Sequence, residues 1–396
     1  MSATGLRADL RVGGRARAAV LVEPGRYETR EYPIPDPPPG GAIVAIVRSG
    51  ICGTDKHTWQ GWTEQYGGST TPRTIRFPLI QGHENVGRIL ALGGPAGSIT
   101  DFEGKPVQEG DRVVVSPNVS CGTCWACTHL LPYTLCERTE DYGNTLSAAD
   151  APHLLGGWAE AMVVLPGSHL FPVPDDLPDD VAVMAELMAV TVGLDRARSW
   201  SALPSEPFLM DDTVVVYGVG PLGLCHVIKA RMLGAGTIIA IDRSPARLAF
   251  ARELGADVTL DVREVSAAEQ LARVRDLTGG RGADVVVEAA GVPEVVPAAI
   301  DLLRPGGLLI EAGNFSDGGE VAISPHRHLC SKGIRLMGVA GEEPGAYLPA
   351  LRQLARHRST IPAIDRFVSD RFDLADADAA MRRSIDPSSR KVVFAP

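Results

Sequence analysis

A turn that contains three glycines constrains the fold of this chain most. Residues 213–217 (Thr-Val-Val-Val-Tyr) form a short β-branched run, and Gly218, Gly220 and Gly223 follow it at the spacing Gly-x-Gly-x-x-Gly. The first two glycines allow a tight turn and a close approach of the backbone to a pyrophosphate, and the third lets the next helix pack against the strand. We therefore predict a strand, a turn and a helix that bind a dinucleotide. The predicted contact residues are Gly218, Val219, Gly220, Pro221, Leu222 and Gly223.

The acid after the next strand bears on which dinucleotide binds. Asp242 follows Gly223 by 19 residues and comes directly after the apolar run 237–241. A carboxylate there can bind both ribose hydroxyls and repels a 2′-phosphate, which favours NAD over NADP. Arg243 and Arg247 keep the alternative open, because an arginine nearby can stack on adenine or hold a phosphate.

The length and the pattern of apolar runs predict two domains. A chain of 396 residues is too long for one hydrophobic core. Between about residues 188 and 338, compact apolar runs alternate with helical stretches, which is typical of a doubly wound parallel sheet. The strands expected there are 213–217, 237–241, 284–288 and 308–311, and the helices are 222–233 and 245–254. We predict that this α/β nucleotide-binding domain interrupts a mainly β domain. The β domain is formed by 1–187 and 339–396, with strands at 42–47, 111–116 and 391–394.

The composition excludes several functions. A net charge of −10 argues against nucleic acid or an anionic membrane as the main partner, because both require a basic surface. The longest apolar run, 214–228, is interrupted by glycines and is too short to span a bilayer. The N-terminus lacks the apolar core of a secretory signal. Seven cysteines, four of them within sixteen residues, fit metal binding in a reducing compartment, so we expect a cytoplasmic protein.

The four clustered cysteines predict a structural metal site. Cys121, Cys124, Cys127 and Cys136 present four thiolates on one short lobe, at about residues 117–140. Structural zinc takes a closed tetrahedral shell of such ligands, and a closed shell leaves no position for a substrate. Disulfides and an iron–sulfur cluster are the alternatives.

A second set of residues predicts a catalytic zinc site. The candidates are Cys52, Thr54, Asp55, His57, His83, Glu84 and Glu186. A catalytic zinc needs about three protein ligands and one open position. Cys52 and His83 suit this role, and Glu84 or Glu186 can complete the shell. Each has a structural explanation when taken singly, as a core thiol, a core histidine or a capping acid, but their coincidence with the nucleotide motif is improbable.

These motifs, in this order along nearly the whole chain, resemble those of the zinc-containing medium-chain alcohol dehydrogenases. The shared segments are Cys52-Gly-Thr-Asp-Lys-His57, Gly82-His-Glu84, the four-cysteine lobe, Gly156-Gly-Trp-Ala-Glu160, the Glu186 segment and the glycine turn. The resemblance implies a GroES-like catalytic domain joined to a Rossmann domain, with the active site in the cleft between them.

The resemblance also implies roles for the candidate zinc residues. Cys52 and His83 correspond to ligands of the catalytic zinc, and Glu84 corresponds to an acid that can enter or leave its shell. Asp55 would hydrogen-bond His83 and fix its tautomer. Glu186 stands where the liver-type enzymes have a cysteine, and an acid there is similar to the sorbitol, threonine and secondary-alcohol branch.

The reaction implied by the resemblance is hydride transfer between NAD and a small-molecule secondary alcohol or polyol, or the corresponding carbonyl, in a homodimer or homotetramer. Thr54 and His57 match a proton relay from the alcohol to water. Residues 58–80 and 139–155 are longer than is usual in the family. The first of these segments is either a surface loop or a wall that sets substrate size, and it carries Trp59, Trp62, Tyr66 and Arg73.

Two other functions stay open at this point. One is a zinc-binding and nucleotide-binding protein of the same fold without dehydrogenase activity. Such a chain need not keep Thr54 and His57 beside Cys52 and His83. The other is a zinc-free enzyme similar to the quinone reductases, which lack the ligand pair and usually the four-cysteine lobe.

Overall fold

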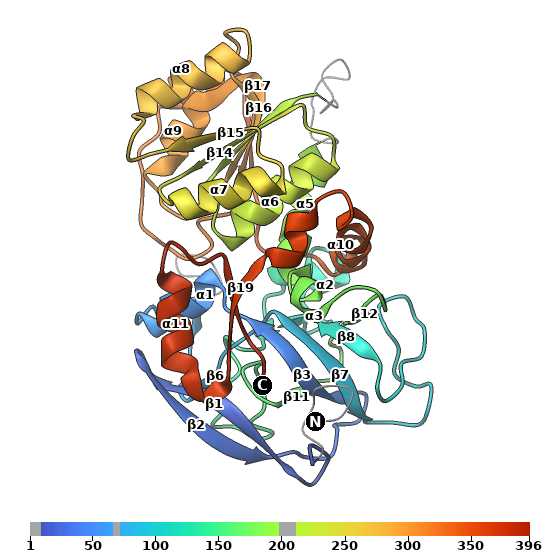
Figure 1. Ribbon diagram of the computed structural model, residues 1–396. Helices are drawn as coiled ribbons and strands as arrows, with labels where there is room; N and C mark the ends of the chain where they lie inside the picture. Colours follow the sequence, from blue (N-terminus) through green and yellow to red (C-terminus); the bar gives the residue numbers. More distant parts are fainter. Residues whose placement is uncertain (1–8, 66–71, 198–210) are drawn as a thin grey trace. The chain divides into compact units, whose positions relative to one another are not determined.

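The computed structural model describes residues 9–65, 72–197 and 211–396, which form two compact units (Figure 1). The first unit comprises the described part of Met1–Glu186 together with Glu343–Ala355 and Asp365–Pro396. The second comprises the described part of Leu187–Glu342 together with Arg356–Ile364. The sequence analysis placed 356–364 in the β domain, but this segment packs with the second unit and buries Ile361 and Ile364.

The first unit is built on a seven-stranded sheet. Its order is β12-β8-β7-β3-β20-β19, and β11 also pairs with β3. The strands are β3 (Ala42–Gly50), β7 (Asn85–Leu92), β8 (Arg112–Val115), β11 (Ala161–Val164), β12 (Leu170–Pro172), β19 (Val368–Phe372) and β20 (Lys391–Phe394). A smaller sheet joins β1 (Arg15–Glu23), β2 (Arg26–Pro33) and β6 (Leu79–Ile80). The helices of this unit include α1 (Gly53–Trp59), α2 (Trp125–Thr128), α3 (Asp179–Ala182) and α11 (Ala377–Ile385).

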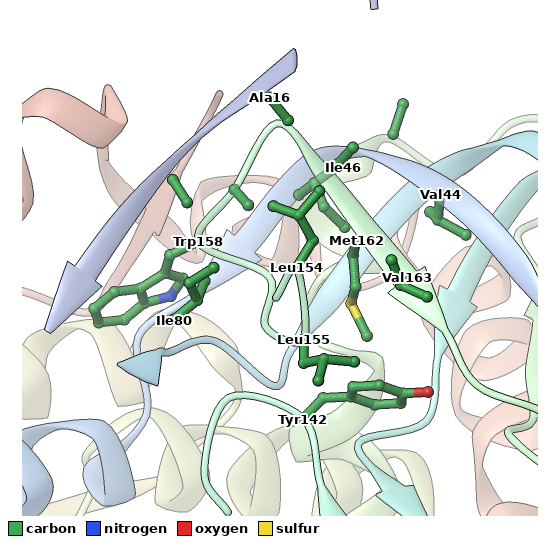
Figure 2. Close-up of a cluster of buried hydrophobic side chains, with 14 of the residues drawn as sticks. Ala16, Val44, Ile46, Ile80, Tyr142, Leu154, Leu155, Trp158, Met162 and Val163 are labelled. Atoms are coloured by element: carbon green, nitrogen blue, oxygen red, sulfur yellow. The ribbon is translucent and has the colours of Figure 1, made fainter. Parts of the chain in front are cut away.

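The core of the first unit holds the end of β3 in place. Figure 2 shows Val44 and Ile46 of β3 among side chains from β1, β6 and β11, with Trp158 nearby. The fully buried Trp158 donates its indole N–H to the carbonyl of Gly50 (3.2 Å), which is the last residue of β3. Because α1 begins three residues later, this core fixes where α1 starts.

The second unit is a parallel sheet of six strands with the order β15-β14-β13-β16-β17-β18. The strands are β13 (Thr213–Tyr217), β14 (Thr237–Asp242), β15 (Val258–Asp261), β16 (Ala283–Glu288), β17 (Leu303–Glu311) and β18 (Arg335–Gly338). The connecting helices are α6 (Pro221–Met232), α7 (Pro245–Leu254), α8 (Ala267–Leu277) and α9 (Val295–Leu302). Figure 1 shows α6 beside α7 and α8 beside α9, on opposite faces of the sheet. From the centre of the sheet the chain first proceeds outward to one edge, through β13, β14 and β15, and then to the other edge, through β16, β17 and β18. The strand order thus reverses between β13 and β16, as in doubly wound dinucleotide-binding sheets.

The elements predicted for this unit are confirmed, with small shifts at their ends. β13 and α7 begin and end at the predicted residues, and α6 begins at Pro221 rather than Leu222. β17 begins at Leu303 rather than Leu308, because Leu303 pairs with Ala283 across a register shift. Among the described residues, no helix has the length and apolar character needed to cross a membrane.

Candidate active site and nucleotide site

The start of α1 positions Cys52. The residue follows β3 directly, and its backbone N–H donates to Asp55 Oδ2 (2.8 Å), so the carboxylate secures the N-terminus of the helix. Asp55 is fully buried, and its carbonyl accepts a bond from Gln81 Nε2 (3.1 Å). The hydroxyl of Thr54 lies 3.8 Å from Cys52 Sγ. The relay candidate Thr54 therefore lies directly beside the candidate metal thiolate.

A tight turn before β7 brings His83 and Glu84 to the same place. Gly82 has φ +96°, and a Cβ there would lie 2.3 Å from Trp158 Cδ1, so the turn requires glycine. His83 Nδ1 lies 3.8 Å from Asp55 Oδ1. One donor atom each from Cys52, His83 and Glu84 lie within 4.8 Å of one another. The three residues offer one sulfur, one nitrogen and one oxygen, and zinc binds donors of all three kinds.

The electrostatics of this site favour a cation. Burial lowers the pKa of His83, but nearby anionic groups, led by Asp55, raise it well above its ordinary value. Glu186, which is buried in the first turn of α4 (Ala185–Val190), contributes to this shift. Both acids considered in the sequence analysis therefore act on the site, Glu84 from within the three-ligand group and Glu186 through its charge.

Lys391 is a site residue that the sequence analysis did not identify. It begins β20, is fully buried and forms an ion pair with Glu84, and its ammonium also donates to the carbonyl of Ile51 (3.0 Å). Burial lowers the pKa of Lys391, but the neighbouring acids, led by Glu84, raise it above its ordinary value, so the ammonium stays charged. A Cβ on Gly50 would lie 1.8 Å from Glu84 Oε2, so this pair also requires glycine at position 50. In the sequence, the feature that could have pointed to Lys391 was a lysine at the start of the apolar run 391–394.

His57, the second relay candidate, is covered by an aromatic ring from the long segment 58–80. Its ring stacks on Trp62 with centroids 4.7 Å apart and planes at 19°, and the Trp62 backbone N–H donates to the His57 carbonyl (3.0 Å). Burial, with a smaller effect of Lys56, lowers the pKa of His57. The imidazole is therefore neutral at pH 7, as a proton acceptor must be.

The two long segments noted in the sequence contact each other. In the first, β4 (Glu64–Gln65) pairs with β5 (Arg73–Thr74). Tyr66, one of the aromatic residues noted in this segment, lies outside the described residues. The carbonyl of Pro78 accepts a bond from the Ala148 N–H (2.8 Å), and Arg76 pairs with Asp150 (2.8 Å). The two segments 58–80 and 139–155 therefore support one another.

The geometry of the four-cysteine lobe fits a tetrahedral metal. Cys124 Sγ lies 3.5 Å from Cys127 Sγ and 3.9 Å from Cys136 Sγ. A disulfide needs about 2.0 Å, whereas a tetrahedron with zinc–sulfur bonds of about 2.3 Å has edges of about 3.8 Å. The donor atoms of all four cysteines lie within 4.8 Å of one another. A hydrogen bond from the Thr123 backbone, and then one from the Arg138 side chain, lower the pKa of Cys121 to about 5. The thiolate form of Cys121 is therefore already favoured.

The glycine turn has the form that a pyrophosphate site requires. Gly218 has φ +88°, and a Cβ there would lie 2.5 Å from the Ala290 nitrogen. A Cβ on Gly223 would lie 1.8 Å from the Gly218 carbonyl oxygen. Gly220 caps the N-terminus of α6, and a Cβ there would meet nothing within 4 Å. Two glycines are therefore required by packing, while the third leaves open space at a helix N-terminus that favours an anion.

Asp242 lies at the end of β14, and its carboxylate forms a hydrogen bond with the glycine turn. Its Oδ2 accepts a bond from the Val219 N–H (2.7 Å), and its Oδ1 accepts one from the Ser244 N–H (2.8 Å). Arg243 is exposed beside it, and Arg247 is partly buried in the first turn of α7. Asp242 therefore contacts the turn directly, and the two arginines follow it in the chain, at the start of α7.

Comparison with known proteins identifies the family to which both parts of the chain are similar. The family model "Alcohol dehydrogenase GroES-like domain" matches residues 38–175, and "Zinc-binding dehydrogenase" matches residues 221–356. The chain is 37% identical to 5-exo-hydroxycamphor dehydrogenase of Pseudomonas putida, over 92% of this chain and 94% of that protein.

Two solved structures are similar over nearly the whole chain. An alcohol dehydrogenase from Thermotoga maritima matches with a TM-score of 0.85 and 29% identity, covering 97% of this chain and 100% of that one. A zinc-binding dehydrogenase from Sinorhizobium meliloti, bound to NADP, matches with a TM-score of 0.77 and 26% identity over the same shares.

Proposed function

Because the chain belongs to the zinc-containing medium-chain alcohol dehydrogenase family, we propose that it transfers a hydride between a secondary alcohol and NAD. The observation that carries this proposal is the group formed by the partly buried Cys52 and the buried His83 and Glu84. Zinc held there supplies a Lewis acid that lowers the pKa of an alcohol or polarises a carbonyl, and a nicotinamide cofactor takes up or returns the hydride.

The residues around this group have distinct tasks. Cys52 and His83 bind the metal, and Glu84 is the third ligand, held by Lys391. Asp55 lies against His83 Nδ1 and fixes the orientation of the imidazole. Glu186 is the second acid, which can replace Glu84 when the shell changes.

Thr54 and His57 move the alcohol proton. The Thr54 hydroxyl lies beside Cys52 and accepts the proton from the alcohol. His57 is half-buried, and its lowered pKa keeps it neutral and able to pass the proton to water. Trp62 holds the imidazole in place by stacking.

The four-cysteine lobe holds a second, structural zinc. Its four sulfurs lie within 4.8 Å of one another, and a zinc held by all four would have no open position for a substrate. In this proposal the lobe stabilises residues 117–140 and takes no part in catalysis.

NAD is the proposed cofactor, because the Asp242 carboxylate would face the ribose and repel a 2′-phosphate. Two backbone N–H groups already fix the orientation of that carboxylate. The NADP-bound relative makes NADP the outcome to test against. If NADP is preferred, the exposed Arg243 is the phosphate partner to examine first.

The substrate we propose is a secondary alcohol. The relative from Pseudomonas putida is named for an alcohol on a bicyclic ring. Of the two roles open to the segment 58–80, we favour the wall that sets substrate size, and its described part contacts 139–155 through Pro78 and Ala148. Polyols are the second candidate. Glu84 and Glu186 would both offer carboxylate oxygens to a zinc held at this site, and such a zinc would suit a substrate that chelates through two oxygens.

A substrate panel on protein of known zinc content tests the proposal. We expect two zinc ions per chain and a higher kcat/KM for secondary or cyclic alcohols than for ethanol, with NAD preferred over NADP. Cys52→Ala should abolish activity while the zinc of the four-cysteine lobe remains. Protein with two zinc ions, bound NADH and no turnover of any alcohol or carbonyl would favour the binding protein without dehydrogenase activity.

A further inference from the structure

Two acids lie side by side at the carboxyl edge of the nucleotide-binding sheet. Glu288 ends β16 and Glu311 ends β17, and the two residues are register partners in adjacent parallel strands. Glu288 is fully buried, and Glu311 is partly buried. Neither belongs to the zinc sites or to the glycine turn.

Each acid holds the loop that follows its strand. Glu288 Oε1 accepts bonds from the N–H groups of Ala290 (2.8 Å) and Gly291 (3.1 Å). Glu311 Oε1 accepts bonds from the N–H groups of Gly313 (3.1 Å) and Asn314 (3.0 Å). Each carboxylate therefore fixes the first turn of backbone beyond its strand.

The Asn314 amide joins the two carboxyl groups. Its Nδ2 donates to Glu288 Oε2 (3.2 Å) and to Glu311 Oε1 (3.1 Å). A Cβ on Gly313 would lie 2.2 Å from Glu288 Oε2, so the second loop also packs directly on the first acid. The loops 289–291 and 312–314 are thus held to each other through this cluster.

Two carboxylates this close cannot both be ionised in a buried site. Burial, and then the charge and hydrogen bond of Glu311, raise the pKa of Glu288 to about 8. The titratable groups that face Glu288 are Glu311 from β17 and Tyr217 from β13. At neutral pH the cluster therefore keeps one proton between its two acids.

The cluster lies under the position where a dinucleotide crosses the sheet. A Cβ on Gly218 would lie 2.5 Å from the Ala290 nitrogen, so the loop 289–291 touches the glycine turn. Dinucleotides bind where the strand order reverses, here between β13 and β16, and the second half of the sheet serves the second nucleotide. The loops after β16 and β17 therefore border the nicotinamide half.

We propose that Glu288 and Glu311 share one proton and act as positioning residues, holding the loops 289–291 and 312–314 in the shape that receives the nicotinamide half of the cofactor. The inference rests on the proposed function only in taking a nicotinamide dinucleotide as the ligand. When the shared proton is lost to solvent, two negative charges face each other and the loops separate. Cofactor affinity then falls as the pH rises.

Titration of the full-length, zinc-loaded chain with NADH between pH 6 and pH 10 tests this idea. Above the pKa, the fraction of the protein that keeps the shared proton falls tenfold with each pH unit. The Kd of the wild type for NADH should therefore rise roughly tenfold from pH 7 to pH 9. Glu311→Gln keeps the oxygen that accepts the loop bonds and removes the second charge, so its Kd should change by less than about twofold over that range. The exposed Glu264→Gln in the same unit is the matched control and should behave as the wild type.

A second measurement reports the proton directly. The infrared difference spectrum between pH 7 and pH 10 should contain the band of a buried protonated carboxyl, and Glu311→Gln should lack it. A Kd that rises equally in the wild type and in Glu311→Gln, or the absence of this band in the wild type, would overturn the proposal. If NADH binds at no pH, the proposed function fails and the cofactor role fails with it, while the infrared band still decides whether the proton is shared.

Discussion

The buried ion pair of Lys391 and Glu84 gives the sharpest test of the candidate metal site in the first unit. Both side chains are fully buried, and the ammonium has two contacts that replace water, Glu84 and the Ile51 carbonyl. Lys391→Met keeps the unbranched side chain as far as Cε and removes the charged nitrogen. The variant leaves Glu84 buried without its cation, while Lys391→Met/Glu84→Gln removes both charges.

The size of the effect follows from burial. Removing one partner of a buried ion pair destabilises a protein by about 3–5 kcal/mol, whereas removing both is often nearly neutral. For a unit of this size, 1 kcal/mol shifts the melting temperature by about 2–4 °C. Lys391→Met should therefore melt roughly 6–20 °C lower than the wild type. The double variant should recover most of that loss.

The assay is thermal unfolding of the four proteins of the double-mutant cycle, with zinc content measured in each so that loss of metal is not mistaken for loss of the pair. The coupling free energy between Lys391 and Glu84 should be about 2 kcal/mol or more. If the double variant is no more stable than Lys391→Met, the pair does not act as a unit and the reasoning is wrong.

Three further variants test the other sites. Cys124→Ser should lower the zinc content from two ions to one and destabilise the lobe, as measured by elemental analysis and proteolysis, while retention of two ions would contradict the structural site. Asp242→Ala should bring the kcat/KM values for NAD and NADP closer together, and an unchanged ratio would mean that this acid does not select the cofactor. Trp62→Ala exposes His57, whose pKa is lowered by burial. The acid limb of kcat/KM for alcohol oxidation should therefore move up toward the ordinary pKa of histidine, whereas Trp62→Phe should leave it in place.

The features that the sequence predicted are those whose physical cause is local. The glycine turn could be predicted because part of its cause is local: Gly218 has φ +88°, and a Cβ on Gly223 would meet the Gly218 carbonyl oxygen five residues earlier. The clustering of the four cysteines could be predicted because Cys121 and Cys124 are close along the chain, so a short loop brings their sulfurs together. Family resemblance extended this to His83 and Glu84, whose role depends on a distant cysteine.

The features that were missed depend on the pairing of distant strands. Lys391 reaches Glu84 only because β20 pairs with the end of β3, so that Val393 lies opposite Gly50. Glu288 and Glu311 meet only because β16 and β17 are adjacent and in register. In the sequence each of these residues is one charged position at the end of an apolar run, and the register that pairs them cannot be derived from such a run.

The balance of buried charge explains why the catalytic unit and its metal depend on each other. Asp55, Glu84 and Glu186 are buried together, and Cys52 adds a negative charge when it binds a metal as thiolate. Lys391 offsets one of these charges. Ions in such a site are destabilising by several kcal/mol each unless they are neutralised. A dication supplies the missing positive charge, so closing the core around these acids and binding the metal stabilise each other. If the proposed zinc binds here, removing it should therefore destabilise the end of β3 and the start of β20, where Gly50 and Lys391 contact Glu84.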